Sequence, residues 1–142
     1  MNRLIGTWTL RSMSSRDGTT GQETKVWGDN PIGFLTYTAG GHMSAVLAAA
    51  RRPISTASAG DASADEQAML FRQSIAYAGR YELSGDAVIH HVEVAGDPTW
   101  IGKDQKRFVR FEGETLILST PAIATPIAPD PQVFVLAWER VE

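Results

Sequence analysis

The chain has 142 residues, about the size of one domain and too short for two ordinary cores. Its apolar fraction of 43% and charged fraction of 20% are typical of a soluble globular protein and exclude a disordered chain. The net charge of −3 provides no cationic surface for nucleic acid or an anionic membrane. The absence of cysteine excludes disulfides, thiolate metal sites and cysteine nucleophiles. We therefore expect a single domain over residues 1–142.

The sequence also shows no targeting signal. No apolar run approaches the ~18 residues of a transmembrane helix. The first residues, MNRLIGTWTL, lack the apolar segment and the cleavage site of a signal peptide. These features predict a cytoplasmic protein with no membrane partner.

Most of the chain has the pattern of short β-strands. Glycine, proline, aspartate and serine separate runs that are rich in Val, Ile, Thr, Tyr, Phe and Trp. Tight turns that contain glycine are expected at residues 39–41, 84–86 and 112–114. Eight or nine sequential strands with such links predict an all-β, up-and-down antiparallel barrel, because closure removes exposed sheet edges. The predicted strands are Ile5–Met13, Glu23–Trp27, Gly33–Thr38, His42–Ala48, Tyr77–Leu83, Ala87–Ala95, Gln105–Glu112, Thr115–Thr120 and Gln132–Val141.

One segment in the middle of the chain has a helical pattern instead. The sequence from Ser63 to Glu66 has the form of a capping box, which marks the start of a helix. Small or apolar residues at helical spacing include Ala64, Ala68, Phe71 and Ile75. We expect one short helix over about residues 64–76, packed by this face across a barrel end.

Residues 121–131 break the strand pattern in a different way. They contain four prolines together with Ile123 and Ile127. Because proline lacks the N–H that a sheet ladder needs, this composition favours a stiff apolar loop over a strand. An apolar loop of this kind is also a candidate subunit interface, so a homodimer stays open.

Alternation along each strand separates inward from outward side chains. In the strand 105–112, Lys106 and Glu112 share a face that suits water, which leaves Gln105 and Arg107 on the other face. A small eight-stranded barrel either fills its interior or holds one small ligand. The predicted interior is mainly apolar and contains a few polar side chains: Tyr37, Tyr77, Tyr81, His90, Gln105 and Arg107.

The two ends of the chain resemble the Gly-x-Trp signature of lipocalins and other calycins, through Gly6-Thr7-Trp8 and Arg140. The resemblance implies that Trp8 closes the barrel floor beneath Arg140, in a cation–π contact of roughly 0.5–2 kcal/mol. More specifically, nearly the whole chain resembles the bacterial and fungal lipocalin-like domain group. The matching segments are Leu4–Leu10, Asn30–Thr38, Gly41–Ala45, Tyr77–Tyr81, His90–Glu93, Trp100–Arg107 and Leu116–Pro121.

The resemblance implies two kinds of function. Lipocalin-like barrels include ligand carriers, and they include enzymes that isomerise, cyclise or dehydrate polyketide- and terpenoid-like intermediates. The chain is therefore expected to hold a small, mostly apolar, aromatic or oxygenated ligand, or to act on one in the same cavity without a cofactor. A filled barrel that binds nothing is the third hypothesis. The candidate ligand-binding residues are Tyr37, Met43, Tyr77, Tyr81, His90, Trp100, Gln105, Arg107, Leu118 and Trp138, and the candidate catalytic residues are His90, Tyr37 and Arg107.

The histidines and Arg107 each have an ordinary structural interpretation beside the functional one. His90 and His91 point to opposite sides of a strand, so they cannot share a metal, and we expect no metal site. Alternation places His90 inside, as a hydrogen-bonded core group or a proton shuttle, whereas a single bulge would exchange it for His91. A buried Arg107 is either satisfied by neighbouring acceptors or available to clamp a ligand carboxylate or enolate.

Several enzyme classes have no support in the sequence. It lacks the Gly-x-Ser-x-Gly motif of hydrolases, a phosphate-binding loop and a dinucleotide fingerprint. No inward pair of acidic residues suits glycoside hydrolysis. Trp100 lies beside a turn, where it either stacks on a flat ligand or covers a barrel end.

Overall fold

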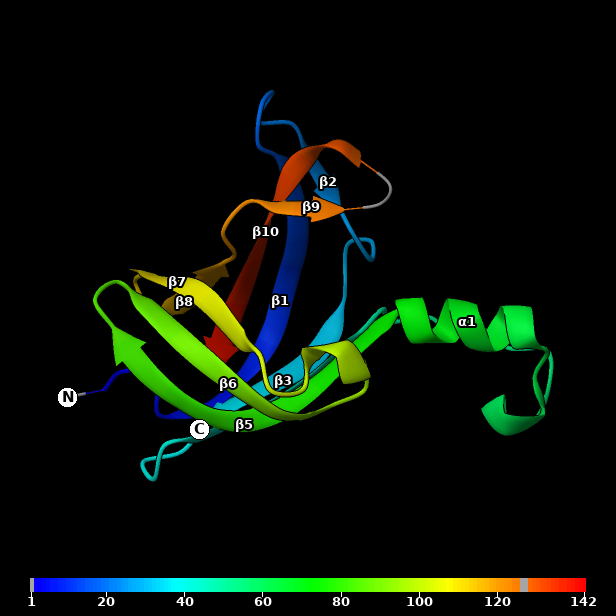
Figure 1. Ribbon diagram of the computed structural model, residues 1–142, viewed down its shortest axis with the longest axis horizontal. Helices are drawn as coiled ribbons and strands as arrows, with labels where there is room; N and C mark the ends of the chain where they lie inside the picture. The colour runs from blue at the N-terminus through cyan, green and yellow to red at the C-terminus, as the bar shows by residue number, and fades with distance from the viewer. Residues whose placement is uncertain (1, 126–127) are drawn as a thin grey trace.

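Ten strands follow one another along the described chain, and eight of them close into a barrel (Figure 1). The computed structural model describes residues 2–125 and 128–142. Neighbouring strands are antiparallel, and pairing of the first with the last closes the ring, which confirms the predicted up-and-down barrel. The barrel strands, in order around the ring, are β1 (Gly6–Asp17), β3 (Ile32–Tyr37), β4 (His42–Ala48), β5 (Ser74–Ser84), β6 (Ala87–Ala95), β7 (Asp104–Glu112), β8 (Thr115–Ser119) and β10 (Ala128–Arg140).

Two short strands, β2 (Glu23–Lys25) and β9 (Ile123–Thr125), lie outside the ring. β2 pairs with the end of β1, and β9 pairs with the start of β10. Because the end of β1 also pairs with β10, these four strands form a ribbon that rises above the barrel, at the top of Figure 1. We call this part of the sheet the upper ribbon.

The upper ribbon corrects the prediction of a stiff loop over residues 121–131. Most of this segment is strand, and β9 and β10 pair at Ala128↔Thr125 and Gln132↔Ile123. The register is irregular between these two pairs, and Pro129 and Pro131 lie in that stretch. A missing N–H is tolerated in such an irregularity, so prolines do not prevent pairing there. Residues 126–127 of the predicted loop lie outside the described residues.

The helix α1 (Ala64–Arg72) begins where the capping box predicts, and Ser63 Oγ accepts a hydrogen bond from the Glu66 amide at 3.2 Å. It ends earlier than expected because β5 begins at Ser74 and takes Ile75 into the sheet. Without Ile75, the apolar face has little area to bury. The helix projects away from the barrel (Figure 1), and Phe71 is 53% exposed. The predicted packing of this face across a barrel end is therefore wrong.

The barrel floor has the contact that the Gly-x-Trp resemblance implies. Trp8 is buried, its Nε1 donates to the Leu4 carbonyl at 2.9 Å, and the Arg140 guanidinium lies 4.2 Å from the ring centroid. Arg140 also donates to the Arg3 and Ile5 carbonyls, each at 2.6 Å. Gly6 has φ +137°, and a Cβ there would meet the backbone carbonyl oxygen of Glu142 at 2.5 Å as well as Arg140 Nη1, so this close approach needs glycine.

Two short 3₁₀ helices complete the described structure, η1 (Ala59–Asp61) and η2 (Pro98–Trp100). η2 follows β6 and contacts it, whereas η1 precedes α1 in the projecting arm. Over residues 2–125 and 128–142, no helix has the length and apolarity needed to cross a bilayer.

Candidate functional site

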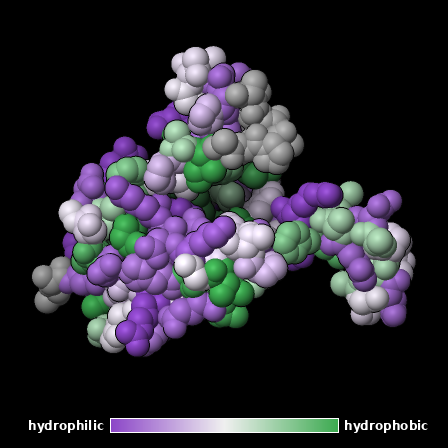
Figure 2. Space-filling model, viewed as in Figure 1, coloured by the Kyte–Doolittle hydropathy of each residue, from purple (hydrophilic) through white to green (hydrophobic). Residues whose placement is uncertain are grey.

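A cavity of about 260 Å³ lies inside the barrel, and most of its wall is apolar. Most of its polar side chains gather on three neighbouring strands, with Tyr77 on β5, His90 on β6, and Gln105 and Arg107 on β7. Figure 2 shows hydrophobic side chains beneath the upper ribbon, where it meets the barrel. The remaining lining residues are Met13, Leu35, Ala45, Leu47, Ile75, Trp100, Leu118, Thr120, Ile123, Phe134, Leu136 and Trp138.

His90 lies between two tyrosines in the barrel interior. Its Nε2 is 2.6 Å from the Tyr37 hydroxyl and its Nδ1 is 2.7 Å from the Tyr77 hydroxyl. Only 1% of the His90 surface is exposed. Burial, followed by the positive charge of Arg107, lowers the pKa of His90 to about 3, so the imidazole is neutral at physiological pH. Burial also raises the pKa of Tyr37 and of Tyr77, which keeps both hydroxyls protonated.

Arg107 is half-buried beside this group, and its hydrogen-bond partners within the chain are neutral acceptors. Its Nη1 donates to the Lys106 carbonyl at 2.9 Å, and the guanidinium lies 3.5 Å from Gln105 Oε1. Over the described residues, no carboxylate comes within ion-pair distance of it. The cation is therefore available to a ligand.

Trp138 adds a donor without a partner. The side chain is 2% exposed and lines the cavity. Its buried Nε1 has no hydrogen-bond partner in the described part of the chain. An unpartnered buried N–H costs about 1–3 kcal/mol, which a ligand acceptor within reach would recover.

The structure brings seven of the ten predicted binding residues to the cavity wall: Tyr77, His90, Trp100, Gln105, Arg107, Leu118 and Trp138. The other three, Tyr37, Met43 and Tyr81, are buried in the core and are absent from the described lining. Tyr37 lies behind His90, whereas Tyr81 donates to the Thr38 carbonyl at 2.7 Å. Trp100 packs edge-on to Tyr77, with ring centroids 5.3 Å apart.

Residues 5–141 of the chain match the lipocalin-like domain family. The chain belongs to this family. A relative from Aspergillus oryzae (strain ATCC 42149 / RIB 40), the 4'-hydroxy-3'-methoxypropiophenone carrier protein ppsC, is 41% identical over 87 residues. That alignment covers 54% of this lipocalin-like chain and 76% of the relative.

Two crystal structures are similar to the lipocalin-like protein over most of its length. A lipocalin-like protein from Bacteroides uniformis ATCC 8492 covers 98% of this chain and 99% of its own, at 15% identity and a TM-score of 0.49. An uncharacterized protein from Bacteroides eggerthii DSM 20697 covers 94% and 98%, at 14% identity and a TM-score of 0.45.

Sequence reasoning missed some lining residues of the lipocalin-like protein for identifiable reasons. The register of β1 shifts between Leu10 and Ser12, which brings Met13 inward out of the simple alternation. Thr120 continues the alternation of Leu116 and Leu118, so the pattern contained a signal for it. Ile123 belongs to the segment that was expected to form a loop.

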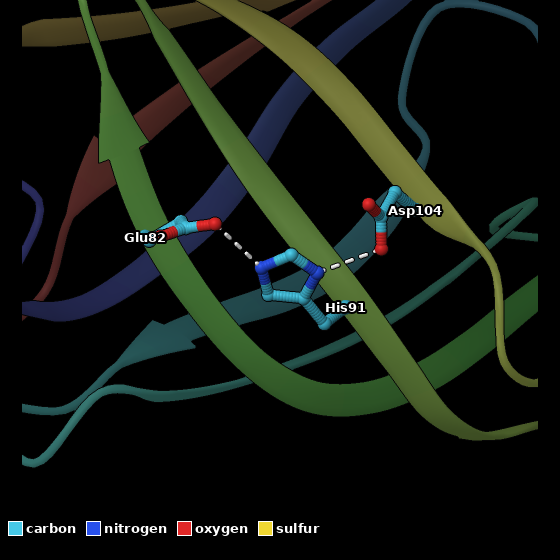
Figure 3. Close-up of polar contacts among 3 residues, drawn as sticks. All are labelled: Glu82, His91 and Asp104. Carbon is cyan, nitrogen blue, oxygen red and sulfur yellow. Dashed lines mark hydrogen bonds and ion pairs between the residues drawn. The ribbon is translucent and has the colours of Figure 1, made fainter.

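The second histidine of the pair lies on the outside of the barrel, between two carboxylates (Figure 3). His91 Nδ1 is 2.7 Å from Asp104 and Nε2 is 2.9 Å from Glu82. Hydrogen bonds to Asp104 and then to Glu82 raise its pKa. The residues described contain no cluster of three His, Cys, Asp or Glu side chains suited to a metal ion.

The lipocalin-like protein is expected to lose a small amount of stability as His91 deprotonates. The folded pKa is raised, so its contribution is present below the unfolded pKa of 6.5 and lost as pH rises through the folded value. The side chain is 38% exposed, so screening keeps the contribution below about 1 kcal/mol. Urea denaturation of the wild type and His91→Gln at about pH 6 and pH 9 measures it. An advantage of the wild type that grows with pH would contradict the prediction.

Proposed function

We propose that this lipocalin-like protein is a carrier or binding protein for one small, mostly apolar, oxygenated molecule inside its barrel. The observation that supports this most directly is the cavity itself. A largely apolar wall meets a few convergent polar groups on β5, β6 and β7, which is the usual character of a small-molecule site. The relative from Aspergillus oryzae, which is named as the carrier of a hydroxylated and methoxylated aryl ketone, supports the same class of ligand.

The size of the cavity suits a single substituted ring. A dry cavity of roughly 150 Å³ is enough to bind benzene. The cavity of about 260 Å³ therefore has room for one aromatic ring with short substituents. Leu35, Leu47, Leu118 and Phe134 would contact the ring, while Arg107 and Tyr77 would contact its oxygen atoms.

The alternative function is a cofactor-independent isomerase, cyclase or dehydratase that moves a proton in the same cavity. His90 would be its natural base, with Tyr37 as a second proton donor and Arg107 as the stabiliser of enolate charge. A base with a pKa of about 3 removes protons poorly near neutral pH, and both nitrogens of His90 already face tyrosine hydroxyls. Tyr37 is also absent from the described cavity lining. These observations favour the carrier.

The carrier function predicts that filling the cavity abolishes binding. Ala45 lines the cavity, whereas its neighbour Val46 is 60% exposed on the outer face of β4. Ala45→Phe is expected to weaken binding of 4'-hydroxy-3'-methoxypropiophenone at least about tenfold, a loss of about 1.4 kcal/mol, while Val46→Phe leaves it unchanged. Quenching of tryptophan fluorescence measures the affinity, because Trp100 and Trp138 line the cavity.

Circular dichroism of both variants checks that the barrel is folded. Equal binding by wild type, folded Ala45→Phe and Val46→Phe would show that the probe binds outside the cavity. If neither this probe nor an apolar dye binds the wild type, the filled-barrel hypothesis replaces the carrier.

A further inference from the structure

The direction of the hydrogen bonds around His90 follows from the environment of Tyr37. Tyr37 is 1% exposed, and over the described residues the one hydrogen-bond partner of its hydroxyl is His90 Nε2. If Tyr37 accepted a proton from Nε2, its own O–H would be buried without an acceptor, at a cost of about 1–3 kcal/mol. Tyr37 therefore donates to Nε2.

This direction determines what Tyr77 offers to the cavity. A neutral imidazole has one N–H, so when Nε2 accepts a hydrogen bond, the proton is on Nδ1. His90 Nδ1–H then donates to the Tyr77 hydroxyl oxygen at 2.7 Å. The O–H of Tyr77 is not used by His90, and Tyr77 lines the cavity. A ligand in the cavity therefore meets Tyr77 as a hydrogen-bond donor.

Several other polar groups of the wall are donors as well, whereas Gln105 Oε1 accepts from the Arg107 guanidinium at 3.5 Å. Thr120 Oγ1 accepts from the Phe134 amide at 3.0 Å, which leaves its hydroxyl hydrogen free to donate. Trp138 Nε1–H is buried without a partner in the described chain. The Arg107 guanidinium can only donate, and the described lining contains no aspartate or glutamate to balance its charge. The wall thus presents several donors and one uncompensated cation.

We infer that the cavity selects the ionised form of an acidic ligand oxygen, a phenolate, enolate or carboxylate on a mostly apolar molecule. This inference rests on the proposed carrier function and specifies the charge of its ligand. A neutral ligand leaves the half-buried Arg107 without a counter-charge, whereas an oxyanion accepts from Arg107 and from Tyr77 together. The charge-assisted bonds favour the ionised form and so lower the pKa of a bound phenol.

A para-acyl phenol tests this inference directly, because its phenolate absorbs at longer wavelength than the protonated phenol. The probe is 4-hydroxypropiophenone, and the matched control is 4-methoxypropiophenone, which cannot ionise. At a pH about half a unit below the pKa of the free phenol, where the free probe is mostly protonated, the bound hydroxy probe is expected to be mostly phenolate. Its apparent pKa is expected to fall by at least about one unit on binding, equivalent to a tenfold preference for the anion.

Variants of β7 separate the role of Arg107 from a general effect of charge. Arg107→Met is expected to leave the bound probe protonated and to bind the two probes within about threefold of each other. Arg110 on the same strand is exposed and pairs with Glu112, so Arg110→Met is the matched control and keeps the phenolate spectrum. A second pair, 4-propylbenzoate and its methyl ester, tests whether a carboxylate is preferred in the same way.

The outcomes distinguish this inference from the carrier function. If both probes of each pair bind with equal affinity and the phenol stays protonated, selection of an anion is wrong and the carrier function stands. If no probe binds the wild type while its circular dichroism shows a folded barrel, both are wrong. A phenolate spectrum that survives in Arg107→Met would also overturn the assignment to Arg107.

Discussion

Acidification from about pH 6.5 to pH 4 is expected to lower the free energy of unfolding by about 3 kcal/mol through His90 alone. The folded pKa of His90 is about 3, well below its value of 6.5 in an unfolded chain. Between these two values the unfolded state binds a proton that the native state does not bind. The free energy of unfolding therefore falls as pH falls below 6.5. Urea denaturation at several pH values between these limits measures the slope.

A variant that keeps the hydrogen bonds but cannot titrate provides the control. His90→Gln offers one acceptor to Tyr37 and one donor to Tyr77, matching the direction of the bonds in the wild type. It is expected to lose most of the acid-dependent slope. His90→Leu removes the acceptor for Tyr37 and is expected to cost about 2 kcal/mol at neutral pH. An unchanged acid slope in folded His90→Gln would show that other groups cause the acid sensitivity.

The two adjacent histidines are thus expected to give the free energy of unfolding opposite pH dependences, because they lie on opposite faces of β6. His90 faces the core, where burial favours the neutral ring, so stability is lost as pH falls. His91 faces outward between Asp104 and Glu82, which favour the charged ring, and its contribution is lost as pH rises. Measured together, the variants of these neighbours separate burial from charge pairing within a single strand.

Much of the barrel could be predicted from the sequence because its turns are marked locally. β4 and β6 begin and end at the predicted residues, and the turns before β4 and β6 contain glycines with positive φ, Gly41 and Gly85. Alternation also placed His90 and Arg107 on the inner face. These features depend on residues that are close together along the chain, so they can be recognised in a single sequence.

What the sequence could not predict depends on distant contacts. Alternation gives the face of a side chain and not its depth, so it could not show that Tyr37 lies behind His90 and away from the described cavity wall. The shift in β1 that brings Met13 inward depends on its pairing with β10, more than a hundred residues along the chain. Pairing of β9 with β10 likewise overcame the local preference of prolines for a loop.

Removal of the Trp8 side chain is expected to cause the largest loss of stability in the barrel. Trp8→Ala creates a cavity at a position that is 1% exposed, which typically costs about 3–5 kcal/mol. It also removes the hydrogen bond to Leu4 and the surface on which Arg140 lies. Urea denaturation near neutral pH measures the loss.

Arg140→Met separates the charge from the packing at this floor. Met preserves some apolar contact with Trp8, but it cannot donate to the Arg3 and Ile5 carbonyls, so a loss of about 1–2 kcal/mol is expected. A greater loss in Arg140→Met than in Trp8→Ala would show that carbonyl capping, and not the buried ring, closes the barrel. Because Trp8 is absent from the described cavity lining, folded Trp8→Ala is expected to retain affinity for the carrier probe. Stability and ligand binding would then depend on different ends of the same barrel.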